Sequence, residues 1–196
     1  MILDLKPMIP IQELRRPSPS KRKKMKIIAI AAVAINGIIG KGSELPWNIP
    51  EDLKFFRDST RDQVVLMGRK TYQALGKALP KRKNGIITRD LKFTANDADV
   101  FQSIEKGIEY YQNQSELSGK ILFIIGGAEI YNVSRAFLDE LWLTEINEEV
   151  EGDVYFPQYH SGNLAWSEFR REKLGDQNDF VSSSFHYQFS RFLKEV

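Results

Sequence analysis

Hydrophobic and polar positions divide the chain into short apolar segments separated by segments of helical spacing. The first apolar segment is continuous, as expected of a strand buried on both faces of a parallel sheet. Strands are predicted at residues 27–34, 63–67, 85–88, 121–125, 141–146, 167–173 and 180–192. Helices are predicted at residues 48–59, 69–76, 103–113 and 128–136. This alternation predicts an α/β fold with a mostly parallel central sheet covered by helices, and the closing run of strands predicts an antiparallel C-terminal edge.

Polar residues mark where two of these helices begin. Asn48 is followed three residues later by Glu51, which is the spacing of a capping box, and Pro50 is tolerated in a first helical turn. Ser103 is a typical N-cap for the helix that runs to residue 113. We therefore expect Asn48 and Ser103 to cap their helices through their side chains.

The first 24 residues differ in composition from the rest of the 196-residue chain. They contain four prolines and carry seven Lys and Arg against two Asp and Glu, a charge of +5, so the remainder carries −3 of the net charge of +2. We predict a flexible basic N-terminal tail over residues 1–24 and one folded domain over residues 25–196. The mildly acidic body argues against a nucleic-acid surface. No Cys and only two His are present, so no metal site is expected.

The start of the chain also fits a secretory signal. A basic run at residues 21–24 precedes an apolar run at residues 27–35, with Ala-Val-Ala at 32–34 in the place of a cleavage site. The apolar run is too short to span a bilayer. A buried strand over the same residues is the alternative, and the pattern that follows the run favours the strand.

Asp52 is the first candidate for chemistry. A carboxylate in a first helical turn is ordinarily a surface charge that the helix dipole favours. Here Trp47 precedes Asp52, and Phe56 lies four residues later on the same helical face. Apolar neighbours remove water from a carboxylate and raise its pKa, which is typical of functional carboxylates. A carboxylate in this setting can also pair with a planar amidine-like edge of a ligand.

Two junctions between a strand and a helix are candidate phosphate cradles. Gly68-Arg69-Lys70-Thr71 combines free backbone N–H groups with two cations and a hydroxyl, and Ile125-Gly126-Gly127-Ala128 allows a ligand to approach the backbone closely. Each fits equally well with an ordinary turn. No G-x-G-x-x-G follows any strand. Thr88-Arg89 ends another strand, and Arg89 together with Arg69 could neutralise a 2′-phosphate, which favours NADPH over NADH.

Taken together and in order, these segments resemble those of dihydrofolate reductases, from Met25 to the C-terminus. The resemblance is carried by Gly40, Leu45-Pro46-Trp47-Asn48 with Asp52, Met67-Gly68-Arg69-Lys70-Thr71, Leu79-Pro80 with Arg82 and Asn84, Ile125-Gly126-Gly127, Leu143-Thr144, Gly152-Asp153 and Phe156-Pro157. It implies a doubly wound sheet of about eight strands with four helices. It also implies hydride transfer from NADPH to the pterin of dihydrofolate, giving tetrahydrofolate.

The resemblance assigns roles to particular residues. Asp52, backed by a hydrogen bond from Thr144, would support protonation of the pterin, and Arg82 would pair with the α-carboxylate of the glutamate tail. The catalytic set is Asp52, Trp47 and Leu45. The substrate-binding set is Ile30, Ala32, Asp52, Leu53, Phe56, Leu75, Leu79, Arg82, Ile125 and Thr144. The cofactor-binding set is Ala32, Ile39, Gly40, Gly68, Arg69, Lys70, Thr71, Thr88, Arg89, Ile125, Gly126, Gly127, Ala128, Glu129, Ile130 and Tyr131.

Further expectations concern the surroundings of this site. The loop over residues 36–47 would act as a lid that excludes water, and the peptide bond between Gly126 and Gly127 would be cis. Gly85 stands where the family has an aliphatic strand residue. Antifolate inhibitors are expected to bind. We expect a cytoplasmic monomer that binds neither nucleic acid nor membrane.

Three rival functions share parts of this pattern. A reductase of the riboflavin pathway has the same architecture, but Trp47, Asp52 and Arg82 argue against it. A nucleotide-binding module without turnover would keep the cofactor motifs, yet it would have no need for Asp52 and Arg82 together. The basic tail could add a contact to nucleic acid or to an acidic membrane, although it has no aromatic residue for base stacking.

Overall fold

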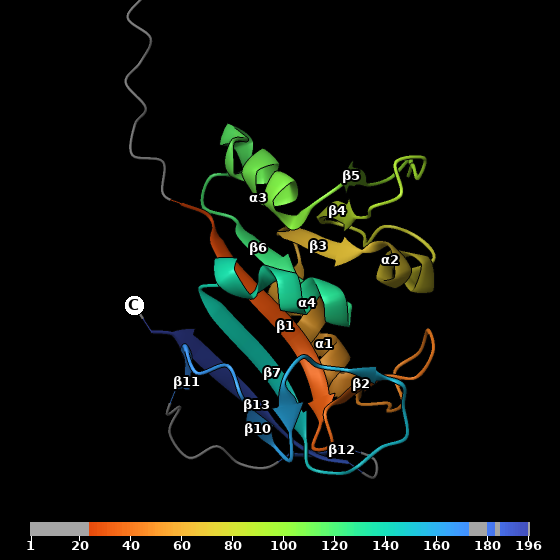
Figure 1. Ribbon diagram of the computed structural model, residues 1–196, viewed down its shortest axis with the longest axis vertical. Coiled ribbons are helices and arrows are strands. Elements are labelled where there is room, and N and C mark those ends of the chain that lie inside the picture. The colour runs from red at the N-terminus through yellow and green to blue at the C-terminus, as the bar shows by residue number, and fades with distance from the viewer. Residues whose placement is uncertain (1–23, 173–179, 183–184, 196) are drawn as a thin grey trace, which may run out of the picture.

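The structure is a computed structural model that describes residues 24–172, 180–182 and 185–195. Its centre is a sheet with the strand order β11-β13-β7-β1-β6-β3-β4-β5, and β12 pairs with β13 (Figure 1). These strands are β1 (Lys26–Ala34), β3 (Val64–Gly68), β4 (Lys83–Ile87), β5 (Asp99–Phe101), β6 (Ile121–Ile124), β7 (Glu140–Ile146), β11 (Phe169–Arg171), β12 (Phe180–Ser182) and β13 (Phe185–Lys194). The chain proceeds from β1 to one side of the sheet and later returns to the other, which makes the sheet doubly wound.

The directions of the strands confirm the predicted fold class. From β7 through β1, β6, β3 and β4 to β5, every neighbouring pair is parallel. At the other end β13 runs antiparallel to β7, β11 and β12. Residues 27–34 form the middle of this sheet as part of β1. The strand interpretation of this segment therefore prevails over the signal-peptide interpretation.

Helices cover both faces of the sheet because side chains alternate along each strand. The helices are α1 (Pro50–Thr60), α2 (Arg69–Leu75), α3 (Ile104–Gln112) and α4 (Ala128–Ser134), with short 3₁₀ turns at Ser115–Leu117 and Arg135–Phe137. On one face, residues of α3 and α4 pack on Ala29, Leu66 and Leu122. On the other face, residues of α1 and α2 pack on Ile28, Val65 and Phe123.

Two two-stranded ribbons outside the main sheet were not predicted. One pairs β2 (Ile38–Gly40) with β8 (Val154–Tyr155), and the other pairs β9 (Tyr159–His160) with β10 (Asn163–Leu164). Strand β5 was also missed. All five segments have two or three residues, which is too short for a hydrophobic period to be visible.

The expected cap of α1 is wrong, and that of α3 is confirmed. Helix α1 begins at Pro50, its N-cap is Ile49, and no side chain among the described residues caps it. A proline disfavours the helical conformation in the residue before it, and Ile49 is accordingly extended, with φ −121° and ψ 93°. The start therefore lies beyond the reach of Asn48. The side chain of Ser103 does accept a hydrogen bond from Lys106 N, at 3.4 Å.

The C-terminal strands differ from the prediction in their bounds. A single strand over 180–192 is wrong, because β12 folds back and pairs antiparallel with β13, so that Phe180 lies opposite Tyr187. The strand predicted over 167–173 is shorter, Phe169–Arg171, and residue 173 lies outside the described residues. The predicted flexible tail, apart from its last residue, also lies outside them. Within the described part of the chain, no helix combines the length and apolar character needed to cross a membrane.

Packing explains why residue 85 is a glycine in this chain. A Cβ atom added at Gly85 would lie 2.4 Å from Leu66 Cδ2 and 3.0 Å from the Tyr111 ring, closer than side chains allow. Tyr111 is fully buried, and its hydroxyl donates a hydrogen bond of 2.9 Å to Asp99. The tyrosine of α3 therefore fills the space that an aliphatic residue would take in β4.

A buried carboxylate network holds β1, β7 and β13 together. Glu140 on β7 is 3% exposed and accepts hydrogen bonds from Trp142 Nε1 at 2.7 Å and Arg191 Nε at 2.8 Å. Lys26 also pairs with it. Burial by itself would raise the pKa of Glu140, but the bonds from Arg191, Lys26 and Trp142 outweigh burial and place this pKa at about 2.

We expect Glu140→Gln to lower the free energy of unfolding by about 1–3 kcal/mol at neutral pH. Removal of one partner of a buried pair costs about 3–5 kcal/mol, and the cost is smaller here because Lys26 and Arg191 are partly exposed to water. The folded pKa lies below the unfolded one, so this stabilisation is full above the unfolded pKa and is lost as pH falls through about 2. Urea unfolding at neutral and acidic pH measures it. The exposed Glu149→Gln is the control, and equal stability of both variants at neutral pH would contradict the expectation.

Candidate active site

Asp52 is buried in the first turn of α1 and bonded to the neighbouring strand. Its side chain is 8% exposed, and Oδ1 accepts a hydrogen bond of 2.6 Å from Thr144 Oγ1 on β7. The bond expected between these two residues is therefore present. Burial raises the pKa of Asp52, and the hydrogen bond from Thr144 opposes this effect. Among the described residues, Oδ2 has no hydrogen-bond partner, so one carboxylate oxygen is left for a ligand or water.

The surroundings of Asp52 are apolar on two sides. Trp47 is 7% exposed and packs with Ile49 and Ile146, and Phe56 packs with Ile30 and Ile125 on the same face of the sheet as α1. The indole Nε1 of Trp47 is buried, and it has no hydrogen-bond partner among the described residues. A buried N–H group without a partner is costly. A polar ligand or a water molecule next to Trp47 would remove that cost.

Tyr131 of α4 reaches the same region from the opposite face of the sheet. Its hydroxyl donates a 2.8 Å hydrogen bond to the carbonyl oxygen of Ile30 on β1. Burial raises the pKa of Tyr131, and the negative charge of Asp52 raises it further. Tyr131 is thus a neutral hydrogen-bond donor that fixes β1 next to Asp52. The sequence offered no signal for this bond, although Tyr131 was in the predicted cofactor-binding set.

The two predicted phosphate cradles lie side by side because β3 and β6 are adjacent and parallel. Gly68 N donates a 2.7 Å hydrogen bond to Gly126 O. The peptide bond between Gly126 and Gly127 is cis, and Gly126 has a φ of +114° that L side chains rarely adopt. A Cβ atom on Gly68 would lie 3.0 Å from Ile130 Cγ1. We call residues 68–71 and 126–128 the cradle. It sits at the carboxyl edge of the sheet, where open α/β sheets bind ligands.

Cations surround the cradle, but they do not all point toward it. The Arg69 guanidinium lies 5.9 Å from the centre of the Phe93 ring, and Lys70 is exposed. Arg89 Nη2 pairs with Glu129 Oε1 of α4 at 2.9 Å. Thr88 is buried, and its hydroxyl accepts a 3.1 Å hydrogen bond from Asp90 N, which fixes the turn before Arg89.

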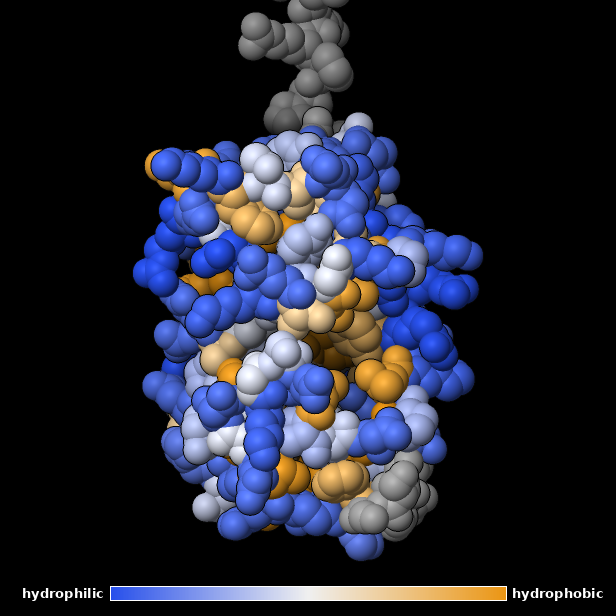
Figure 2. All heavy atoms as spheres, turned by 90° about the vertical axis from the view of Figure 1, so that its right-hand side faces the viewer, coloured by the Kyte–Doolittle hydropathy of each residue, from blue (hydrophilic) through white to orange (hydrophobic). Residues whose placement is uncertain are grey.

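Several apolar side chains near the carboxyl edge of the sheet are exposed. Leu45, Leu53 and Leu75 expose 47%, 49% and 43% of their surface, whereas Ile30 within β1 and Ile125 just after β6 are buried. Figure 2, which faces the side of the molecule where α2 and β2 lie, shows a hollow with a hydrophobic interior and a largely hydrophilic surround. A hollow with a hydrophobic interior is typical of a binding slot for an apolar ligand.

Arg82 is held in a fixed orientation at the turn between α2 and β4. Its Nε donates to Thr60 Oγ1 at 2.9 Å, Nη1 to Pro80 O at 2.8 Å, and Nη2 to Arg57 O at 3.1 Å. A guanidinium has five N–H groups, so one N–H on each terminal nitrogen stays free of these bonds. Burial and then the nearby Arg61 and Arg57 lower the pKa of Arg82. This arrangement leaves two donors for a carboxylate.

Asn84, for which no role was predicted, supports the turn before β4. It is 5% exposed, its Oδ1 accepts from Leu79 N at 2.9 Å, and its Nδ2 donates to the carbonyls of Leu79 and Arg82. These bonds shape the turn that carries Arg82 and Leu79. The preference of asparagine for side-chain bonds to nearby backbone in turns was the available signal.

The loop over residues 36–47 is bound to a second loop in this structure. Gly42 N donates to Asp153 Oδ1 at 2.7 Å, and Lys41 pairs with Glu151 at 2.9 Å. A Cβ atom on Gly152 would lie 2.6 Å from the Gly40 carbonyl oxygen, so only glycine fits against β2. Ile39 and Gly40 lie on β2, and half-buried Ala32 lies on β1.

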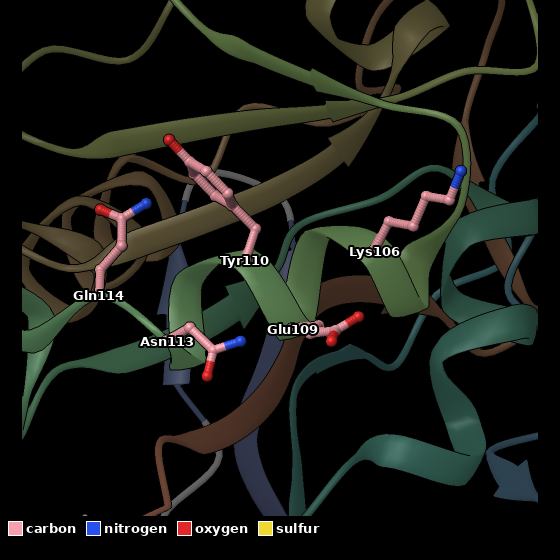
Figure 3. Close-up of a pocket in the computed structure, with 5 residues that line it drawn as sticks. All are labelled: Lys106, Glu109, Tyr110, Asn113 and Gln114. Atoms are coloured by element: carbon pink, nitrogen blue, oxygen red, sulfur yellow. The ribbon is translucent and has the colours of Figure 1, made fainter. Parts of the chain in front are cut away.

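A separate hollow lies beside α3 (Figure 3). Its lining residues are Lys106, Glu109, Tyr110, Asn113 and Gln114. None of the predicted site residues belongs to it. A neighbouring hollow includes Lys24, Ile27 and Glu109, which places Glu109 near the amino end of β1, at the opposite edge of the sheet from the cradle.

The fold and this edge define an open α/β domain with a ligand-binding crevice at the carboxyl ends of its strands. A family model described as dihydrofolate reductase matches residues 26–193. The dihydrofolate reductase of Staphylococcus haemolyticus is 33% identical over 163 residues, 83% of this chain and 94% of that protein. The enzyme of Buchnera aphidicola is 34% identical over 172 residues, 88% of this chain and 99% of that protein. The chain belongs to the dihydrofolate reductase family.

A solved structure agrees with this membership. The dihydrofolate reductase from Enterococcus faecalis complexed with NADP(H) and RAB-propyl has a TM-score of 0.76 and 26% identity to this chain. The match covers 88% of this chain and 98% of that one. The expected architecture is thus shared over nearly the full length of a family member.

Proposed function

We propose that the chain reduces 7,8-dihydrofolate to 5,6,7,8-tetrahydrofolate with NADPH, and that residues 25–196 form the catalytic domain. The observation that carries this proposal is the setting of Asp52. A carboxylate buried in apolar surroundings, with one oxygen held by Thr144 and the other free, lies at the strand edge where the glycine cradle begins. The curated relatives are named dihydrofolate reductases, and the solved relative is a complex with NADP(H).

The residues present fit this cofactor. The cradle has glycines where the backbone needs them, since a Cβ atom on Gly68 would lie 3.0 Å from Ile130 Cγ1 and Gly126 has a φ that L side chains rarely adopt. Arg69, Lys70 and Arg89 provide positive charge for phosphate groups at the same edge. When bound, NADPH supplies the hydride. Ala32, Ile39 and Tyr131 would lie near the nicotinamide, and Gly126 to Ile130 beside the phosphates.

Asp52 has two tasks in this proposal. Its free Oδ2 accepts hydrogen bonds from the 2-amino group and ring N–H of the pterin, which orients the ring. Because burial raises the pKa of Asp52, the group takes up a proton at higher pH than an exposed aspartate and supports protonation of the pterin, directly or through a water. Trp47 Nε1 provides a donor for that water, and Leu45 helps to exclude bulk solvent.

The rest of the substrate extends over the apolar slot. Leu53, Phe56, Leu75 and Leu79 line the benzoyl part, and Arg82 pairs with the α-carboxylate of the glutamate tail. Antifolates that share the pterin-like edge would occupy the same slot. We further propose that the loop over residues 36–47 closes over the nicotinamide as a lid, and that the protein acts as a cytoplasmic monomer.

The test is an NADPH oxidation assay with purified full-length protein. We expect the absorbance of the reduced nicotinamide to fall only when dihydrofolate is added. A flat trace with dihydrofolate, together with tight NADPH binding, would instead favour a binding module without turnover. Oxidation with a riboflavin-pathway intermediate but not with dihydrofolate would favour the reductase of that pathway.

A further inference from the structure

The pair between Arg89 and Glu129 lies across the cradle. Arg89 follows β4, and Glu129 lies in the first turn of α4, after β6. The strand order β6-β3-β4 places the end of β3, with Arg69 and Lys70, between them. Neighbouring strands are about 4.8 Å apart, so the two backbones are about two strand spacings apart, and the two side chains together span the cradle.

The ion pair between Arg89 and Glu129 contributes little to the stability of the fold, so a ligand can displace it. Arg89 and Glu129 expose 85% and 66% of their side chains. Exposed ion pairs are weak because water solvates both partners. A phosphate group carries more charge than a carboxylate and offers more oxygens to a guanidinium. A phosphate that enters the cradle can therefore take Arg89 from Glu129.

We propose that Glu129 is a specificity-determining residue that competes with the 2′-phosphate of NADPH for Arg89. In the free protein, Glu129 holds Arg89 across the cradle. When the cofactor binds, Arg89 turns to the 2′-phosphate, and Glu129 is left beside a like charge. Glu129 thereby weakens the preference for NADPH over NADH, which lacks that phosphate. This inference rests on the proposed function, because it assigns the phosphates of the cofactor to the cradle.

The decisive experiment measures binding, not turnover. Isothermal titration calorimetry of the full chain gives Kd for NADPH, for NADH and for adenosine 2′,5′-bisphosphate. We expect Glu129→Gln to lower Kd for NADPH and for the bisphosphate by roughly two- to fivefold, the scale of one exposed ion pair. Kd for NADH, which shares the pyrophosphate but lacks the 2′-phosphate, should fall by a smaller factor. Glu109→Gln, an exposed glutamate at the other edge of the sheet (Figure 3), is the matched control and should change none of the three.

A second variant tests whether the effect passes through Arg89. We expect Arg89→Gln to weaken NADPH and bisphosphate binding, and Arg89→Gln with Glu129→Gln to bind like Arg89→Gln alone. An unchanged Kd for NADPH in Glu129→Gln, an equal gain for NADH, or a gain that persists without Arg89 would each overturn the inference. Failure of the proposed function is a different result: wild-type protein that binds the bisphosphate but does not oxidise NADPH with dihydrofolate.

Discussion

Asp52→Asn is expected to lower kcat for dihydrofolate reduction at neutral pH by at least about a hundredfold, while Kd for NADPH stays unchanged. A side chain that supplies or favours a proton in the transition state contributes about 10²–10⁴-fold to the rate. Asparagine keeps the size of the residue and can still accept the hydrogen bond from Thr144, but it cannot carry the proton. Single-turnover kinetics with saturating NADPH measure the loss.

The pH profile of the variant separates a proton role from a binding role. Without Asp52, protonation of the pterin depends on bulk solvent alone, so the rate of Asp52→Asn should rise steadily as pH falls. The ratio of wild-type to variant rates should therefore shrink toward acid. Asp58→Asn, an exposed aspartate on the same helix, is the matched control and should follow the wild-type profile. Parallel profiles of Asp52→Asn and wild type would show that Asp52 has no role in protonation of the pterin.

The same variant should be at least as stable as the wild type at neutral pH. The folded pKa of Asp52 is raised above its ordinary value. The stability that its protonated form contributes is full below the unfolded pKa and is lost as pH rises through the folded pKa. The wild type at neutral pH thus bears the cost of a buried charge that asparagine lacks. Thermal unfolding that shows a much lower Tm for Asp52→Asn would mean that lost folding accounts for its lost activity.

A feature of the fold could be predicted from the sequence when the residues that determine it are close together along the chain. Five of the six parallel strands were predictable because apolar residues mark each of them, whereas β5 was too short to be seen. The cap at Ser103 was predictable because it is local. The start of α1 was missed because Pro50 acts on its neighbour Ile49, which outweighs the capping spacing of Asn48. The segments β12 and β13 were predicted as one strand although three serines at 182–184 interrupt the apolar pattern, and only their antiparallel pairing shows the division.

In the site too, local features could be predicted from the sequence and contacts between distant residues could not. The glycines of the cradle and the order of the motifs were visible along the chain, and they led to the family. The pairing of Thr144 with Asp52 spans 92 residues and was available only through the resemblance. The pair between Arg89 and Glu129 was not predicted at all, because Arg89 was considered only as a partner for a phosphate group. Contacts between exposed charges on separate elements depend on how those elements are placed in space, and nothing in the local sequence pattern determines that.

Arg82→Leu is expected to raise KM for dihydrofolate by on the order of ten- to hundredfold, with Kd for NADPH unchanged. Three bonds to Thr60, Pro80 and Arg57 fix the guanidinium plane before substrate arrives, so little freedom is lost when the carboxylate binds. Hydrogen bonds to a charged group contribute about 1.5–3 kcal/mol each, and about 1.4 kcal/mol corresponds to tenfold in affinity. Arg82→Lys keeps the charge but loses the paired donors, so it should recover only part of the loss.

Because the bonds to Thr60 and Arg57 also tie the turn before β4 to α1, Arg82→Leu could act through the fold instead of the substrate. A dihydropterin that lacks the glutamate tail separates the two effects. Its kcat/KM should be the same for wild type and Arg82→Leu, since the missing carboxylate is the only group that Arg82 is proposed to bind. Arg61→Leu removes a nearby exposed charge and controls for long-range attraction. An equal loss for both substrates would show that Arg82 supports the shape of the slot and does not bind the tail.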